Sequence, residues 1–270
     1  MSSSKVRVIT YVHELAYTIQ TFDQASIKKA LVQTNLFLAG SVAVKRNLLE
    51  MGVITEQVQV VPSSIPVAAI TDKLAVIDTA SVRASLQLQQ HDQLLVAVGT
   101  ADWRKGNDLF IQMAAHLAQR YPQVHFAWVG VAVGSLEHQR MSYEILKYRL
   151  GGRFHAVPVT SEYLKYIAAS DIFVLPSRED PFPLVVLEAA AAGKPVVCFA
   201  ETGGSPDFVG EKNGAVVPYG DTNAMSAAIE LLLKDPIIRQ HKGEHARAVV
   251  KQEYNIPQVA TRIAQLLASE

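Results

Sequence analysis

The sequence predicts an α/β protein built on a doubly wound parallel sheet, and two observations lead to that prediction. Short continuous apolar runs, such as residues 172–175 and 196–199, are typical of strands buried on both faces of a parallel sheet. These runs alternate with helical segments from residue 93 to about residue 220. Alternation of this kind favours a parallel sheet with right-handed crossovers.

The strands and helices of this main unit can be placed in order along the chain. Strands are expected at 94–99, 124–130, 153–156, 172–175, 196–199 and 215–217. Helices are expected at 107–121, 136–150, 160–170, 184–192, 221–234, 236–253 and 256–268. Thr160 and Asp221 are the predicted N-caps of two of these helices, since their side-chain oxygens can accept from first-turn amides.

The first part of the chain predicts a shorter α/β segment. Strands are expected at 5–12, 35–38 and 58–61, and helices at 23–33 and 41–51, with Ser41 as an N-cap. Residues 62–80 show no clear period and predict a linker. The expected organisation is a partial N-terminal segment (1–65), a linker (66–92), a Rossmann-like domain (93–253) and a C-terminal helix (254–270).

Residues 171–199 contain the chemistry that the rest of the main unit surrounds. A buried strand ends at Pro176, an acidic turn follows, and Pro183 opens a helix that is apolar nearly all round. Glu188 is the only charge in that helix, and a buried carboxylate is costly without a partner. The helix N-terminus offers free amides and a positive dipole end, which suit a phosphate. A core Lys or Arg paired with Glu188 is the structural alternative.

These residues carry a resemblance to a known family. Asp180, Glu188 eight positions later, and the run GKPVV at 193–197 resemble the E-x7-E motif of the retaining group 1 glycosyltransferases (family 4, GT-B fold). The first acid is Asp180, where the family more often has Glu. The resemblance implies that Asp180 and the backbone of Phe182, Pro183 and Leu184 face the donor sugar and its diphosphate. It also implies that Glu188 holds the ribose.

The resemblance extends to other loops of the predicted sheet. Lys105 is similar to the family's diphosphate-binding lysine, with a solvated loop lysine as the alternative. At the place where the family has an arginine stands Thr100, so either one phosphate contact is absent or Arg104 replaces it. Val157 and Pro158 fall where the family's backbone contacts the base. The Gly203–Gly204 loop resembles the one that closes over the donor.

The N-terminal segment resembles the last third of a GT-B N-terminal domain. His13 ends a predicted buried strand, where the family often has a histidine near the donor sugar; a histidine satisfied within the fold is the equal alternative. The earlier strands of such a domain are absent, so a fragment or a truncated relative is expected. In the family the last helix crosses back to brace the N-terminal domain.

Composition limits the other function classes. Lys+Arg and Asp+Glu both number 25, which argues against a broad nucleic-acid surface. The single cysteine, Cys198, lies in a predicted buried strand and favours a cytoplasmic location. The N-terminus has no apolar signal segment, and no apolar run reaches membrane-spanning length. Peripheral membrane association is left open.

The resemblance implies a retaining hexosyltransferase that moves a sugar from a nucleotide-diphosphate sugar to an acceptor hydroxyl without a metal or other cofactor. Its acceptor is a glycan, a lipid or a small molecule, which the sequence does not distinguish. Two alternatives stay open. One is a non-catalytic module that binds the nucleotide sugar or needs a partner chain. The other is a relative that isomerises or hydrolyses the nucleotide sugar, which is disfavoured because no separate acid–base pair is present.

Overall fold

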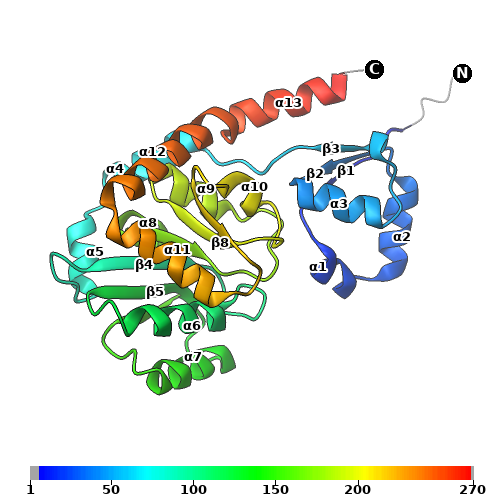
Figure 1. Cartoon of the computed structure of the whole chain (residues 1–270). Coiled ribbons are helices and arrows are strands. Elements are labelled where there is room, and N and C mark those ends of the chain that lie inside the picture. Colours follow the sequence, from blue (N-terminus) through cyan, green and yellow to red (C-terminus); the bar gives the residue numbers. More distant parts are fainter. Residues whose placement is uncertain (1–5, 269–270) are drawn as a thin grey trace, which may run out of the picture.

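The computed structural model describes residues 6–268, which form two lobes (Figure 1). The larger lobe is built on a parallel sheet with the strand order β6-β5-β4-β7-β8-β9. The strands are β4 (Gln93–Val98), β5 (Val124–Val131), β6 (Phe154–Pro158), β7 (Ile172–Leu175), β8 (Val196–Phe199) and β9 (Gly214–Val217). In order of appearance this is 3-2-1-4-5-6, the Rossmann order, so the predicted doubly wound sheet is confirmed.

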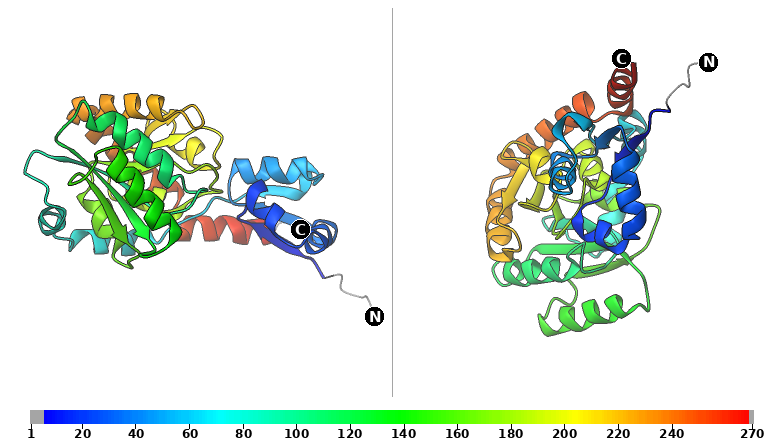
Figure 2. Two further views of the ribbon diagram at one scale, coloured as in Figure 1. Left: turned by 90° about the horizontal axis from the view of Figure 1, so that it is seen from below. Right: turned by 90° about the vertical axis from the view of Figure 1, so that its right-hand side faces the viewer.

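Helices cover both faces of this sheet, as the view from below shows (Figure 2). One face carries α6 (Asn107–Ala118), α7 (Leu136–Lys147) and α11 (Thr222–Lys234). The other carries α4 (Val67–Ala75), α5 (Thr79–Ser85), α8 (Tyr163–Ala169), α9 (Leu184–Ala191) and α12 (Pro236–Glu253). Along β4, Leu95 and Ala97 face the first layer while Leu94 and Val96 face the second, which explains the continuous apolar run.

The smaller lobe is a three-stranded parallel sheet in the order β1-β2-β3. Its strands are β1 (Ile9–Val12), β2 (Leu36–Ala39) and β3 (Val58–Val60), and its helices are α1 (Ala16–Thr21), α2 (Gln24–Gln33) and α3 (Val42–Glu50), with a 3-10 turn η1 (Thr55–Gln57). Ser41 caps α3 as predicted, with its Oγ accepting from the Val44 amide at 3.2 Å. The strand ending at His13 was expected to be buried, but β1 is only half-buried.

The last helix, α13 (Ile256–Ala268), runs from the large lobe to the small one (Figures 1 and 2). Val259 on this helix packs in one apolar cluster with Leu36, Leu38 and Val61 of the small lobe. Two segments pass between the lobes: the chain after β3 and the α12–α13 junction. They meet where Ile65 and Asn255 form a parallel β-bridge. The predicted crossing helix therefore covers the face of the small sheet opposite to α3.

Two sequence-based expectations differ from the structure. Residues 66–92 were predicted as a linker without a clear period, yet they contain α4 and α5. Val67 and Ile70 of α4 are buried in the cluster around α8 and α9. Thr160 was predicted to cap the helix that follows β6, but that helix begins at Tyr163 with Glu162 at its N-cap. Thr160 Oγ1 instead accepts from the Glu162 amide at 3.1 Å, which makes a turn before the helix.

Candidate active site

The candidate site lies at the point where the strand order of the large sheet reverses. β4 and β7 are neighbours there, and the chain leaves them toward opposite sides of the sheet. In open α/β folds a crevice at the carboxyl ends of such strands binds ligands. The loops that bound it here are 99–106 after β4 and 176–183 after β7. Both loops contain residues that the sequence predicts as site residues.

Two glycines allow these loops to approach one another closely. Gly106 has φ +75°, and a Cβ there would overlap the carbonyl oxygen of Pro176. Gly203 has φ +141°, and a Cβ there would overlap the carbonyl oxygen of Asp180. The amide of Asp180 donates to the carbonyl oxygen of Thr202 at 2.6 Å. The loops after β4, β7 and β8 are thus joined through backbone contacts that a side chain would prevent.

Lys105 and Asp180 meet between the loops that follow β4 and β7. The Lys105 ammonium forms an ion pair with Asp180 Oδ2, and both side chains are largely buried, with 17% and 7% exposed. Lys105 comes from the β4 loop, where the Asp102 carboxylate accepts from its amide at 2.8 Å. The stem of Lys105 passes close to Gly99, where a Cβ would lie 3.5 Å from the Lys105 Cδ, an ordinary contact distance. The structure thus brings together the two site residues that are 75 positions apart in the sequence.

Helix α9 begins beside this pair. Pro183 is its N-cap and offers no side-chain hydrogen bond. The Val186 amide donates to the Pro183 carbonyl oxygen at 3.1 Å, which leaves the amides of Leu184 and Val185 for solvent or a ligand. Leu184, the first helical residue, is 48% exposed. The positive end of the helix dipole thus lies at the same carboxyl edge of the sheet as Lys105.

Glu188 lies one turn further into α9, with 7% of the residue exposed. No ion pair holds it within residues 6–268; the Tyr163 hydroxyl donates to Oε1 at 2.8 Å instead. Burial raises the pKa of the Glu188 carboxyl, and the Tyr163 hydrogen bond and the Lys73 charge oppose that rise. Within the described residues, Glu188 is therefore not paired with a core Lys or Arg, which was the structural alternative.

His13 follows β1 in the small lobe. Its ring centroid lies 4.0 Å from that of Tyr11. Burial lowers the pKa of His13, and the Glu14 charge opposes that shift. The next residues reach the large lobe. The amide of Tyr17 donates to Glu179 Oε2 at 3.0 Å, and Leu15 lies beside Gly203. The loop that holds His13 thus faces the loop that holds Asp180.

The other predicted site residues lie around the crevice with different partners. Thr100 is exposed at the start of the β4 loop. Arg104 donates from Nη1 to the carbonyl oxygen of Glu179 at 3.1 Å, so it ties the two loops together. Val157 is buried and Pro158 exposed at the end of β6. Tyr163 opens the helix that follows them.

Sequence reasoning missed one group that shapes the site. Arg178 makes two hydrogen bonds to the Asp108 carboxylate, at 2.8 and 2.6 Å, and its guanidinium lies 4.9 Å from the centre of the Trp103 ring. Its amide also donates to the carbonyl oxygen of Arg104 at 2.8 Å. This cluster fixes the β7 loop against the start of α6. Arg178 and Asp108 are 70 residues apart in the sequence, so their contact becomes visible only in the fold.

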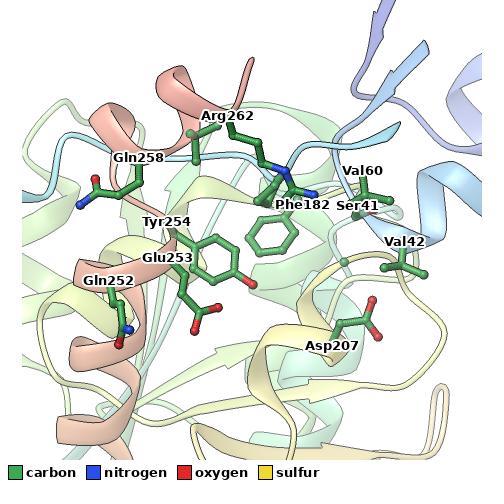
Figure 3. A pocket seen from close by; sticks show the side chains of 13 residues that line it. Ser41, Val42, Val60, Phe182, Asp207, Gln252, Glu253, Tyr254, Gln258 and Arg262 are labelled. Carbon is green, nitrogen blue, oxygen red and sulfur yellow. The ribbon is translucent and has the colours of Figure 1, made fainter. Parts of the chain in front are cut away.

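A separate pocket of about 440 Å³, which we call the hinge pocket, lies between the lobes at the α12–α13 junction (Figure 3). Phe182 stacks on Tyr254 with ring centroids 5.6 Å apart, and both line this pocket. Asp207 and Arg262 point into it from α10 (Ser205–Val209) and α13. The prediction for Phe182 concerned its backbone, and the side chain of this residue lines the hinge pocket. Its backbone remains in the loop that leads to α9.

Residues 6–268 contain no helix that is both long enough and apolar enough to cross a membrane. The same residues contain no group of three or more His, Cys, Asp or Glu side chains placed to hold a metal ion.

The sheet has the Rossmann strand order, and its switch point holds a lysine, a helix N-terminus and a buried acid. This combination is typical of nucleotide-binding domains. Sequence comparison agrees with this class and narrows it. The profile described as "Glycosyl transferases group 1" matches residues 78–269, and the chain belongs to that family.

Two relatives match somewhat more than half of the chain. The D-inositol 3-phosphate glycosyltransferase of Corynebacterium jeikeium is 32% identical over 171 residues, which is 61% of this chain and 41% of that protein. A glycogen synthase of Mycobacterium tuberculosis is 29% identical over 174 residues, 64% of this chain and 41% of that protein. The chain thus spans less than half the length of either relative.

Solved structures match almost the whole chain. Anabaena HepE in complex with UDP superimposes with a TM-score of 0.85 at 21% identity, over 98% of this chain and 72% of that one. Sucrose-phosphate synthase of Thermosynechococcus elongatus gives a TM-score of 0.78 at 25% identity, over 96% and 66%. WaaG, a glycosyltransferase involved in lipopolysaccharide biosynthesis, gives 0.78 at 17%, over 97% and 75%. The two-lobed arrangement is therefore that of GT-B glycosyltransferases.

Proposed function

We propose that this chain binds a nucleotide-diphosphate sugar in the crevice between β4 and β7 and transfers the sugar to an acceptor hydroxyl with retention of configuration. The observation that supports this most is the buried Lys105–Asp180 pair beside the uncapped start of α9. A cation and free amides on one side of a crevice suit a diphosphate. Membership of the glycosyl transferases group 1 family supplies the reaction class.

In this proposal each part of the donor has its own residues. The diphosphate lies between Lys105 and the amides of Leu184 and Val185. An ammonium has three N–H donors, so Lys105 can keep Asp180 and still donate to a phosphate oxygen. Glu188 accepts from the ribose hydroxyls. The base lies against the end of β6 at Val157 and Pro158.

The transferred sugar lies between Asp180 and His13, under the Gly203–Gly204 loop. The bond from the anomeric carbon to the diphosphate oxygen breaks, and a bond to the acceptor oxygen forms on the same face. The acceptor's proton passes to the departing phosphate. Lys105 and the dipole of α9 offset the charge that develops on that phosphate, so the proposal includes no metal or other cofactor.

A uridine nucleotide is the first donor to test, because HepE was solved with UDP, with UDP-glucose, and with UDP and glucose. A hexose is proposed as the transferred sugar on the same ground. A cytoplasmic location also belongs to the proposal, since Cys198 is a buried free thiol.

Calorimetry with UDP, GDP and ADP tests donor binding, and UDP release from UDP-glucose tests turnover. We expect one nucleotide to bind with at least ~10-fold preference and UDP-glucose to be slowly hydrolysed to α-glucose when no acceptor is supplied. β-Glucose as the first product would contradict retention. Failure of all three nucleotides to bind would contradict the donor site.

The alternative is a binding module without transferase activity. It is favoured by one observation, the small lobe, which has only three strands within the described residues. Tight nucleotide binding without turnover of any nucleotide sugar, with and without acceptor mixtures, would support the module. Turnover by the chain alone would exclude it.

A further inference from the structure

The carboxylate of Glu188 has two oxygens in unequal settings. Oε1 accepts a hydrogen bond from the Tyr163 hydroxyl at 2.8 Å. Oε2 is enclosed and has no hydrogen-bond partner among residues 6–268. An enclosed acceptor without a partner costs about 1–3 kcal/mol, so this arrangement is expected to serve a ligand.

Tyr163 contacts Glu188 through its side chain and follows the proposed base site closely along the chain. Tyr163 is the first residue of α8 and follows the turn that leaves β6 at Pro158. Its ring packs with the apolar residues on both sides of α8, so its position is fixed. Burial and then the contact with Glu188 raise the pKa of Tyr163 to about 12. The phenol therefore stays protonated and remains a donor.

We propose that Tyr163 is a positioning residue for the donor nucleotide, because its hydroxyl holds Glu188 so that the carboxylate can accept both vicinal hydroxyls of a ribose. Oε1 keeps one lone pair free and Oε2 keeps two. Oε2 is enclosed by neighbouring atoms in this conformation, so in this proposal those atoms move locally before the ribose reaches it. The Tyr163 hydrogen bond keeps the carboxylate in place during that movement.

This inference rests on the proposed function and adds a residue with a distinct effect. Tyr163 also favours the ionised form of Glu188, which burial disfavours. Loss of its hydroxyl should therefore weaken ribose binding and shift the pH dependence of that binding. The contacts to the diphosphate and to the sugar should not change. A residue that served only the packing of α8 would change neither.

The test is Tyr163→Phe, with Kd for UDP and for 2′-deoxy-UDP measured by calorimetry from pH 5 to pH 8. We expect UDP to bind ~10-fold more weakly, as for a lost hydrogen bond to a charged group. We expect 2′-deoxy-UDP to be affected much less. The acid limb of UDP binding should move to higher pH, because Glu188 loses a bond that favours its ionised form.

Tyr166→Phe is the matched control, since Tyr166 lies one turn on in α8 and, within residues 6–268, Tyr163 is the hydrogen-bond partner of Glu188. In a Glu188→Gln background, Tyr163→Phe should have little further effect on UDP binding. If the wild type prefers UDP to 2′-deoxy-UDP but Tyr163→Phe matches it in affinity and pH profile, the inference is wrong and the donor site stands. If the wild type binds no nucleotide, both are wrong.

Discussion

The buried pair of Lys105 and Asp180 links folding to the proposed chemistry at the scale of single residues. Removing one member of a buried ion pair leaves the other charge without compensation, which is strongly destabilising. A diphosphate adds a second anion for the same ammonium. The pair is thus expected to be both a fold contact and a ligand contact, and the two roles can be separated by measurement.

Lys105→Met should weaken UDP binding by ~10- to 100-fold, the loss of one charge-assisted hydrogen bond. Uridine, which has no phosphate, should bind with unchanged affinity. The melting temperature should also fall, because Asp180 is left buried without its cation. Lys28→Met on the exposed surface of α2 is the control. Equal weakening of UDP and uridine would show that Lys105 does not contact the diphosphate.

A second residue-scale feature is a histidine pair between β5 and β6, far from the crevice. His125 Nδ1 and His155 Nε2 are 3.1 Å apart, and Asp92 lies 3.3 Å from the other nitrogen of His125. Burial and then His125 lower the pKa of His155 to about 4. Burial also lowers the pKa of His125, with Arg153 and Arg83 adding to that and Asp92 opposing it.

This pair should make the fold acid-sensitive. An unfolded histidine takes up a proton near pH 6.5, whereas folded His155 does so near pH 4. Between these values the unfolded state binds more protons, so the free energy of unfolding falls as pH falls. Each histidine adds at most about 1.4 kcal/mol per pH unit to this fall in the free energy of unfolding. Urea titrations from pH 7 to pH 4 should show a shallower fall for His155→Gln than for wild type or the exposed-site control His241→Gln; equal slopes would contradict this.

At the scale of elements, the site depends on loops that fit together through Gly106. Ala at this position would need a positive φ and would overlap the Pro176 carbonyl. Strain of this kind costs about 1–3 kcal/mol. Gly106→Ala should therefore lower the urea midpoint and weaken UDP binding. Gly151→Ala, where a Cβ meets nothing within 4 Å, should leave both unchanged or gain slightly in stability. Equal behaviour of the two variants would show that the close approach is not required.

The sequence predicted the bounds of two buried strands and of the last two helices. The strands 172–175 and 196–199 and the helices 236–253 and 256–268 have the bounds that were expected. Helix α4 was missed because Pro62 and Pro66 suggested a loop, although Pro66 is its N-cap. Its buried residues Val67 and Ile70 are three apart, so a helical period was present but short.

Pairings across the fold were beyond sequence reasoning. The residue types of Lys105, Asp180 and Glu188 indicated a site through their family resemblance, and the structure adds which atoms meet. The hydrogen bond from Tyr163 to Glu188 spans 25 residues and depends on the register of α8 against α9. Neither periodicity nor motif spacing fixes that register, because it follows from tertiary packing.

At the scale of the whole molecule, two segments join the lobes, and a loop of the small lobe also contacts the large one. Val259 of α13 anchors the crossing helix to the small sheet, and Tyr17 reaches the large lobe at Glu179. The hinge pocket lies on the connected side, next to Tyr254. A lobe movement about this connection would carry His13 relative to Asp180. The small lobe thus supplies one wall of the proposed sugar site.

The most direct test is a crystal structure of this chain soaked with UDP. The diphosphate should lie within hydrogen-bond distance of Lys105 Nζ and the first amides of α9, with a ribose hydroxyl on Glu188. Nucleotide density in the hinge pocket beside Tyr254, or density in the β4–β7 crevice that leaves Lys105 and Glu188 without contact, would contradict the proposed donor site.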